Sequence, residues 1–413
     1  ANNNVAVGSQ SLDLNSTGNY NSSVGHNSLS ANTTANHNTA LGYNTLASNS
    51  TGAQNVAIGS VALDANTTAD NNTAVGYAAL GANTTGTRNT AIGSVAADAI
   101  TTGNYNSAVG YAALSAQTTA SGNTAMGDSA GALLTTGANN VAIGQSALNQ
   151  ATTSSDHTVV GYSALSANTT GASNTAVGRT ALQDNTTGDN NVAVGRDALA
   201  NNTTASNNIA IGRDALVTNT TGTGNVAVGK SALDAVVTGN NNTAVGTNAL
   251  SAATGSENTV VGSDAGEAVT SGTNNTFVGK DCAKSTTTGA SNTSVGWSSL
   301  KDNTTGSYNA AFGQSALQEN TTASYNSAFG YRALYQNTDA IHNTGIGYLA
   351  LAALTTGTRN TCVGSGAGDA ITTGGKHTIV GRYNGNSGGL DIRTATNYVV
   401  LADGDGNPRL YLN

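Results

Sequence analysis

Few residues of this chain have the types and spacing that catalysis or metal binding requires. The five His residues are scattered, and no grouping of His with carboxylates recurs at the spacing of a metal site or an acid–base pair. Asp403, Asp405 and Asn407 alternate as in a calcium loop, but Pro408 stands where such a loop has Gly, and no Glu follows. The sequence therefore predicts no enzyme, no metal site and no cofactor.

A second group of residues with binding potential is basic and recurs every 17 residues: Arg179, Arg196, Arg213 and Lys230. Stacked above one another, these side chains would form a stripe that could contact anionic cell-surface sugars. Asp directly follows two of them, and the formal net charge of the chain is −8. A solvated face with local charge pairing is therefore the favoured interpretation, and nucleic-acid binding is not expected.

These basic residues form one column of a repeat that runs through the chain. An anchor residue recurs 23 times from Asn4 to His377, in steps of 17 residues with a single step of 16 before Asn258. Every anchor is Asn except His157 and His377, and a Gly stands four residues after each one. The composition, with 9% charged and 4% aromatic residues, would also suit a disordered chain. The unbroken register argues against disorder.

A typical unit is Asn72–Arg88, and each position of the repeat takes its name from the residue of this unit, so that Val75 and its equivalents occupy the Val75 position. The stretch 73–75 predicts a short strand that ends at Gly76, because its β-branched residues favour extended backbone. We expect a second extended stretch near 79–80 or at 83–85. Because 17 residues are too few for the helical repeats, the unit predicts an all-β fold, a parallel β-solenoid (β-roll) of about 23 coils.

Equivalent residues of stacked coils form ladders, and the sequence indicates what each ladder does. We expect the Val75 and Leu80 ladders to fill a thin interior, and the Asn72 ladder to be structural, with amides bonded from coil to coil. The Ala74 position points away from Val75 yet is also small or apolar. A strand that is apolar on both faces must be covered on both, so we expect a partner chain, a second copy in a parallel bundle.

The runs that resemble Asn55-Val56-Ala57-Ile58-Gly59 are similar to two known groups, and the resemblance covers nearly the whole chain. Heads of trimeric autotransporter adhesins have such runs in left-handed β-roll coils. Phage and marine-virus tail-fibre proteins resemble the chain more closely, through long arrays of the same run followed by Ala-Leu and Asn-Thr-Thr-Gly. The resemblance implies left-handed coils, a parallel homotrimer, and a place outside the cell or on a virion, with a host cell-surface glycan as a partner.

The repeat ends after Gly381, which predicts a repeat shaft over 1–381 and a separate cap over 382–413. Residues 398–402 and 409–412 flank a turn rich in Asp and Gly, as in a β-hairpin. The segment from Leu390 to Arg409 resembles the part of tail-fibre proteins that precedes an endosialidase-type chaperone domain. That resemblance implies a chaperone that trimerises the chains and then cuts itself off, so here we expect it to be missing or cleaved.

Three functions remain open from the sequence. The C-terminal segment favours a structural shaft of an attachment fibre, and a bacterial surface adhesin or filament is the alternative. An ice-binding solenoid is disfavoured, because ice binding needs Thr residues that alternate along an outward face, whereas the Thr residues of this chain are adjacent. No signal peptide or membrane-spanning run is evident, so we expect no membrane insertion and any export segment to be missing or removed. Asn32-Thr33-Thr34 and its equivalents match the glycosylation sequon only because the coil recurs. Cys282 and Cys362 are expected to pack.

Overall fold

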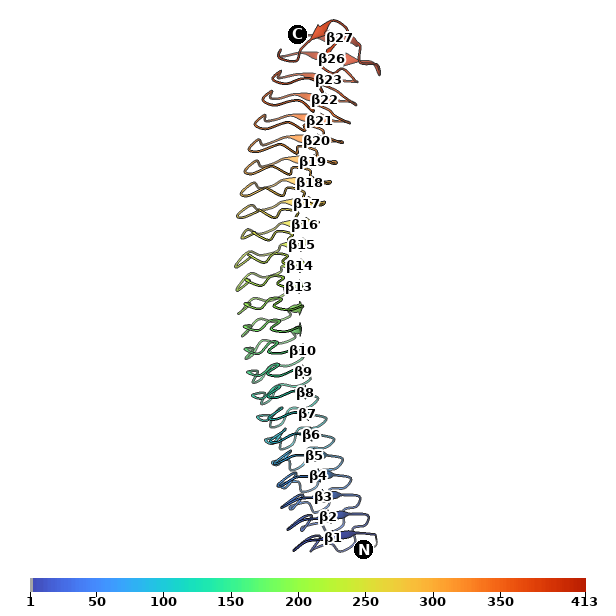
Figure 1. Ribbon diagram of the computed structural model, residues 1–413, viewed down its shortest axis with the longest axis vertical. Coiled ribbons are helices and arrows are strands. Elements are labelled where there is room, and N and C mark those ends of the chain that lie inside the picture. Colours follow the sequence, from blue (N-terminus) through green and yellow to red (C-terminus); the bar gives the residue numbers. More distant parts are fainter. Residues whose placement is uncertain (1–2) are drawn as a thin grey trace. The chain divides into compact units, whose positions relative to one another are not determined.

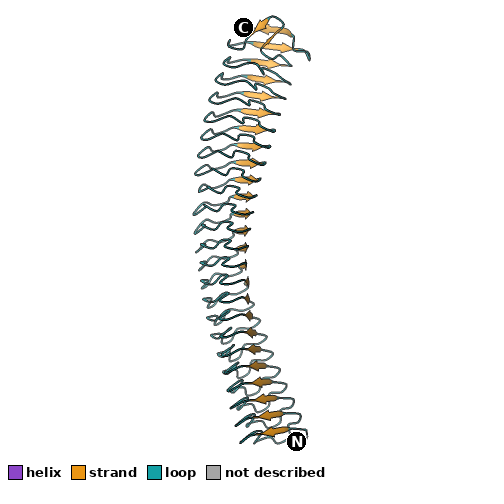
Figure 2. Ribbon diagram, viewed as in Figure 1, coloured by secondary structure: helices purple, strands orange, loops and turns teal. Residues whose placement is uncertain are grey.

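The computed structural model describes residues 3–413, which form β-strands, turns and loops but no helix (Figures 1 and 2). It is a parallel β-solenoid of about 23 turns at a spacing of about 17 residues, and almost every turn contributes one strand of three residues. The predicted all-β parallel β-solenoid of about 23 coils is thus confirmed. The chain divides into two compact units, 1–207 and 208–413.

In the first unit, twelve parallel strands follow one another in chain order. Each pairs with the next in a register offset by one repeat, so that Thr73 lies beside Thr90 and Val75 beside Ile92. The strands are β1 (Val5–Val7), β2 (Ser22–Val24), β3 (Thr39–Leu41), β4 (Val56–Ile58), β5 (Thr73–Val75), β6 (Thr90–Ile92), β7 (Ser107–Val109), β8 (Thr124–Met126), β9 (Val141–Ile143), β10 (Thr158–Val160), β11 (Thr175–Val177) and β12 (Val192–Val194).

The second unit repeats this arrangement and ends in the cap. The 16-residue step does not disturb the ladder, since Thr243 still lies beside Thr259 and the lost residue is absorbed outside the strands. The strands are β13 (Ile209–Ile211), β14 (Val226–Val228), β15 (Thr243–Val245), β16 (Thr259–Val261), β17 (Thr276–Val278), β18 (Thr293–Val295), β19 (Ala310–Phe312), β20 (Ser327–Phe329), β21 (Thr344–Ile346), β22 (Thr361–Val363), β23 (Thr378–Val380), β24 (Asn386–Ser387), β25 (Leu390–Asp391), β26 (Val399–Ala402) and β27 (Pro408–Leu412).

The remainder of each coil is a series of turns and bends, so the expected second extended stretch is wrong. Ala78 and Leu80 have φ angles of 53° and 50°, in the left-handed region. The physical reason is packing: Ala79 and Leu80 are adjacent, and both are fully buried. Successive residues of an extended chain point to opposite faces, so an extended stretch could not bury both. Alternating left-handed residues turn both side chains inward.

The interior of a coil contains Ala74, Ala79 and Leu80, all of them fully buried. Val75 is only half-buried, and at its position Leu41 is 47% exposed. The prediction that the Val75 ladder fills the interior is therefore wrong, whereas the prediction for the Leu80 ladder is confirmed. Successive residues of a strand point to opposite faces, so only one of Ala74 and Val75 can point inward, and in the structure it is Ala74.

Units without Leu at the Leu80 position show that the interior volume is kept constant. Gly131 stands there in one unit, and the nearby Asn83 position then holds the buried Leu134. Gly266 is accompanied in the same way by the buried Val269. A Cβ at Gly266 would lie 3.2 Å from Phe277, a large residue at the Ala74 position. Where one inward position holds a small residue, a neighbouring inward position thus holds a larger apolar one, and the interior stays closely packed.

The cap completes the second unit. Strand β26 pairs in parallel with β23, with Thr378 beside Val399, and antiparallel with β27, so the hairpin lies where the sequence predicts it. A second, two-residue pairing of β24 with β25 precedes it. Tyr383 is fully buried beneath this segment, and its hydroxyl donates to the Leu390 carbonyl at 2.7 Å. Burial raises the pKa of Tyr383 to about 12, so its hydroxyl remains a donor at neutral pH.

Candidate functional site

The anchor Asn residues form a buried ladder of hydrogen bonds. Asn72 is fully buried, and its Oδ1 accepts from the backbone N–H of Asn89 in the next coil at 2.9 Å. Its Nδ2 donates to the carbonyl of Gly86 at 2.9 Å, which closes its own coil. One side chain thus satisfies two buried backbone groups, one between coils and one within a coil. The structural role that the sequence predicts for Asn72 agrees with these contacts.

We expect the Asn72→Ala variant to lose about 2–4 kcal/mol of stability, because the Asn89 N–H and the Gly86 carbonyl would be buried without partners. Thr85→Ala is the matched control in the same unit, since Thr85 is exposed. Thermal unfolding followed by circular dichroism measures the difference. Equal midpoints for the two variants would contradict a structural role for the anchor amide.

His157 replaces the anchor Asn in one coil and takes over part of its bonding. The backbone N–H of His157 donates to Asn140 Oδ1 at 3.0 Å, and its Nδ1 accepts from the backbone N–H of Asn174 at 3.1 Å. An Nδ1 that accepts a hydrogen bond must be unprotonated. Burial lowers the pKa of His157, and the carboxylates of Asp156 and Asp189 only partly oppose this.

The buried imidazole predicts a loss of stability in mild acid. Because the folded pKa of His157 lies below the unfolded value of about 6.5, the unfolded state binds more protons as the pH falls past that value. Its contribution is therefore complete above about pH 6.5 and is lost toward the folded pKa. We expect His157→Asn to lose less stability than the wild type between about pH 7.5 and about pH 5, by on the order of 1 kcal/mol. Unfolding midpoints at the two pH values test this, and identical pH profiles would contradict it.

A second buried amide ladder, at the Asn83 position, was not recognised from the sequence. Asn83 Nδ2 donates to Asn66 Oδ1 at 3.0 Å and to the Gly86 carbonyl at 3.0 Å. The ladder stops where the next coil has Ile100, and there the buried Asn83 Oδ1 has no partner. Asn32, the first residue of a sequon, is also fully buried, so the folded coil does not offer its amide for glycosylation. The recurrence of Asn at this position was the available signal.

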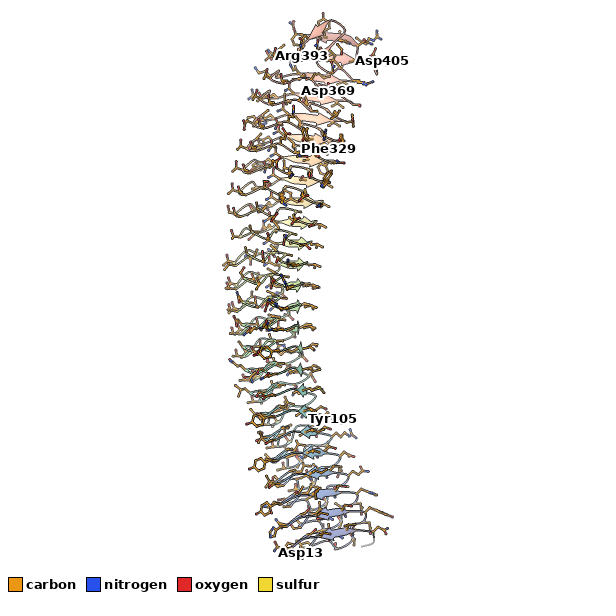
Figure 3. The ribbon with its side chains drawn as sticks, in the orientation of Figure 1. Asp13, Tyr105, Phe329, Asp369, Arg393 and Asp405 are labelled. Atoms are coloured by element: carbon orange, nitrogen blue, oxygen red, sulfur yellow. The ribbon has the colours of Figure 1, made fainter. Side chains whose placement is uncertain are left out.

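The most extensive candidate surface is the outward face of the strands, formed by the Thr73 and Val75 positions. Its apolar side chains are partly exposed, with Ile92 at 42%, and no other part of the described chain covers them. In the second unit, Phe312 and Phe329 stack on this face with ring centroids 4.7 Å apart. Phe329 is labelled in Figure 3. Contiguous exposed apolar surface is typical of interaction sites, and a parallel sheet is normally covered on both faces.

The predicted basic residues belong to both units, Arg179 and Arg196 to the first and Arg213 and Lys230 to the second. Arg196 Nε lies 2.7 Å from Asp197, and Arg213 Nε lies 2.9 Å from Asp214. The Thr180 hydroxyl also donates to Asp197, and this bond, with Arg196, lowers the pKa of that carboxyl. Two of the four cations thus have carboxylate neighbours, as local charge pairing would require.

The remaining chemically active residues are used structurally. Cys282 and Cys362 are free and buried, and burial raises the pKa of both thiols. Asp403 accepts from the backbone N–H groups of Asp405 and Asn407, and it pairs with Arg409. These contacts hold its pKa at about 2. Within residues 3–413, no cluster of three or more His, Cys, Asp or Glu side chains could hold a metal ion.

The chain matches no protein-family model and no curated protein sequence. In the part of the chain that the structure describes, no helix has the length and apolar character needed to cross a membrane.

Proposed function

We propose that this chain is the non-catalytic structural shaft of an attachment fibre, located outside the cell or on a virion. In this proposal three copies lie in parallel, each wound as a left-handed solenoid, with their outward strand faces directed toward a common axis. The number of chains, the hand and the location follow from the resemblance to tail-fibre and adhesin repeats. The proposal assigns the chain no substrate and no cofactor.

The observation that carries the proposal is the apolar outward strand face. Its Val75 position holds only Val, Ile, Leu, Met or Phe in all 23 units, although a solvated face would accept polar residues there. The opposite side of the strand, at Ala74, is already covered by the coil itself. Self-association is the simplest cover, because copies in one register present identical ladders to one another along their whole length.

The test is the mass of the purified chain in solution. Light scattering coupled to size-exclusion chromatography is expected to give three times the mass of the 40.6 kDa chain. A monomer mass over a wide range of protein concentration would overturn the proposal. The gene sequence downstream of Asn413 gives an independent check: a chaperone domain would support a fibre, and a membrane-anchor barrel would point to a bacterial adhesin instead.

A further inference from the structure

The junction of the last coils with the cap contains a cavity of about 330 Å³. Coil residues and cap residues both line it, and its polar and aromatic side chains include Tyr348, Ser365, Asp369, Arg382, Asn384 and Asp405. Figure 3 labels Asp369 and Asp405 in this region of the second unit. A cavity of this size is within the range of small-ligand sites.

A second cavity, of about 290 Å³, adjoins the first. Arg332 and Tyr335 line it, and both cavities share Leu349 and Asp369. The two cavities are neighbours, with Leu349 and Asp369 in the lining of both, and together they are called the groove. The groove lies on the turns of the coils and on the cap, and none of these residues belongs to the outward strand face. Binding in the groove and self-association through the strands are thus compatible.

The charged groups of the groove keep part of their hydrogen-bonding capacity. Within residues 3–413, no ion pair joins Asp369, Asp405 or Arg382 to another side chain, although Asp403 beside them pairs with Arg409. Asp369 is partly buried, which raises the pKa of its carboxyl, while a hydrogen bond from the Ala370 backbone N–H and the nearby charge of Arg382 oppose this shift. Acceptors and donors that converge on a cavity without being paired to one another are available to a ligand.

Tyr348 adds an apolar platform. Tyr331 stacks on one face of its ring, with centroids 5.4 Å apart and planes 11° from parallel. In the next coil the equivalent residue is the small Ser365, so the other face of Tyr348 is directed toward the cavity. The side chain is 55% exposed. In the lining of the second cavity, the Arg332 guanidinium lies 4.9 Å from the ring centroid of Tyr335.

The charges of the groove limit the chemical class of ligand that it can bind. Two Arg and two Asp residues line the groove, so it neither attracts nor repels a polyanion strongly. The lining consists of side chains rather than of an unpaired strand edge, which disfavours an extended peptide. A sugar ring matches both features, since its hydroxyls donate and accept and its C–H face packs on an aromatic ring. We infer that this groove binds a neutral oligosaccharide, and this inference rests on the proposed attachment function for its biological meaning.

The test is biolayer interferometry of the full chain against immobilised neutral tri- and tetrasaccharides built from glucose, galactose, mannose or N-acetylglucosamine. We expect at least one probe to bind, and Tyr348→Ala and Asp369→Asn each to weaken that binding by about tenfold or more. Tyr111→Ala and Asp98→Asn are the matched controls, because these residues occupy the same coil positions in the first unit and do not line the groove. The controls are expected to bind as the wild type does.

Three outcomes would overturn the inference: no binding to any neutral probe, equal loss in the control variants, or binding confined to sulfated sugars and abolished by added salt. Circular dichroism verifies that each variant is folded. If Tyr348→Ala does not fold, the nearly isosteric Asp369→Asn still tests the inference. Light scattering on the same samples separates this inference from the proposed function. A trimer that binds no sugar refutes only the groove, whereas a monomer that binds sugar refutes only the fibre shaft.

Discussion

The Gly76→Ala variant is expected to lose about 3 kcal/mol or more of stability and to open the stack locally. Gly76 ends strand β5 with a φ angle of 143°, a conformation that residues with a side chain rarely adopt. A Cβ added there would lie 2.3 Å from the carbonyl oxygen of Gly93 in the next coil. Since that neighbour is backbone rather than a flexible side chain, the coils would have to separate.

Gly81→Ala is the matched control within the same coil. Gly81 has an ordinary φ angle, the nearest atom to an added Cβ is the Ala78 carbonyl at 3.2 Å, and another unit has Ala47 at this position. We expect its unfolding midpoint to stay near that of the wild type. Hydrogen–deuterium exchange should accelerate in peptides that cover 73–93 of Gly76→Ala only. Unchanged exchange in that variant would show that the glycine ladder is not required for stacking.

The repeat and its glycines could be predicted from the sequence because both depend on local chemistry. A Gly that recurs at one position of every unit indicates a backbone conformation or close approach that only Gly allows, and Gly76 has both. The burial of Leu80 also follows from its type. The cap hairpin was predictable because a turn rich in Asp and Gly separates two apolar stretches.

The direction of the strand faces could not be read from alternation alone. Alternation requires that Ala74 and Val75 point to opposite sides, but it leaves open which side is inside. The larger and more apolar Val75 suggested the interior, whereas in the structure Ala74 points inward beside Leu80 and Val75 points outward. The groove was also hidden, because Asn384 and Asp405 reach it from the cap, where the chain no longer follows the repeat.

Charged side chains on the outward face of the strands, at the Val75 position, are expected to prevent the chains from assembling. We expect the double variant Ile58→Lys/Ile92→Lys to be monomeric, so that its mass falls to about one third of the wild-type value. Both residues occupy the Val75 position, in coils on either side of Gly76, and they are 36% and 42% exposed in the single chain. A lone coil tolerates Lys at such places, because the ammonium group remains in water. An interface between three chains would bury six such charges without partners, at a cost of several kcal/mol.

Tyr77→Lys is the control for added charge, since Tyr77 is 60% exposed and lies beyond the strand. That variant is expected to keep the trimer mass, while circular dichroism spectra of both variants match the wild type. A double variant that keeps both its fold and its trimer mass would exclude the strand face as the interface. A folded monomer would instead show that the Val75 ladder, although outward in a single coil, is apolar in every unit because other copies of the chain cover it.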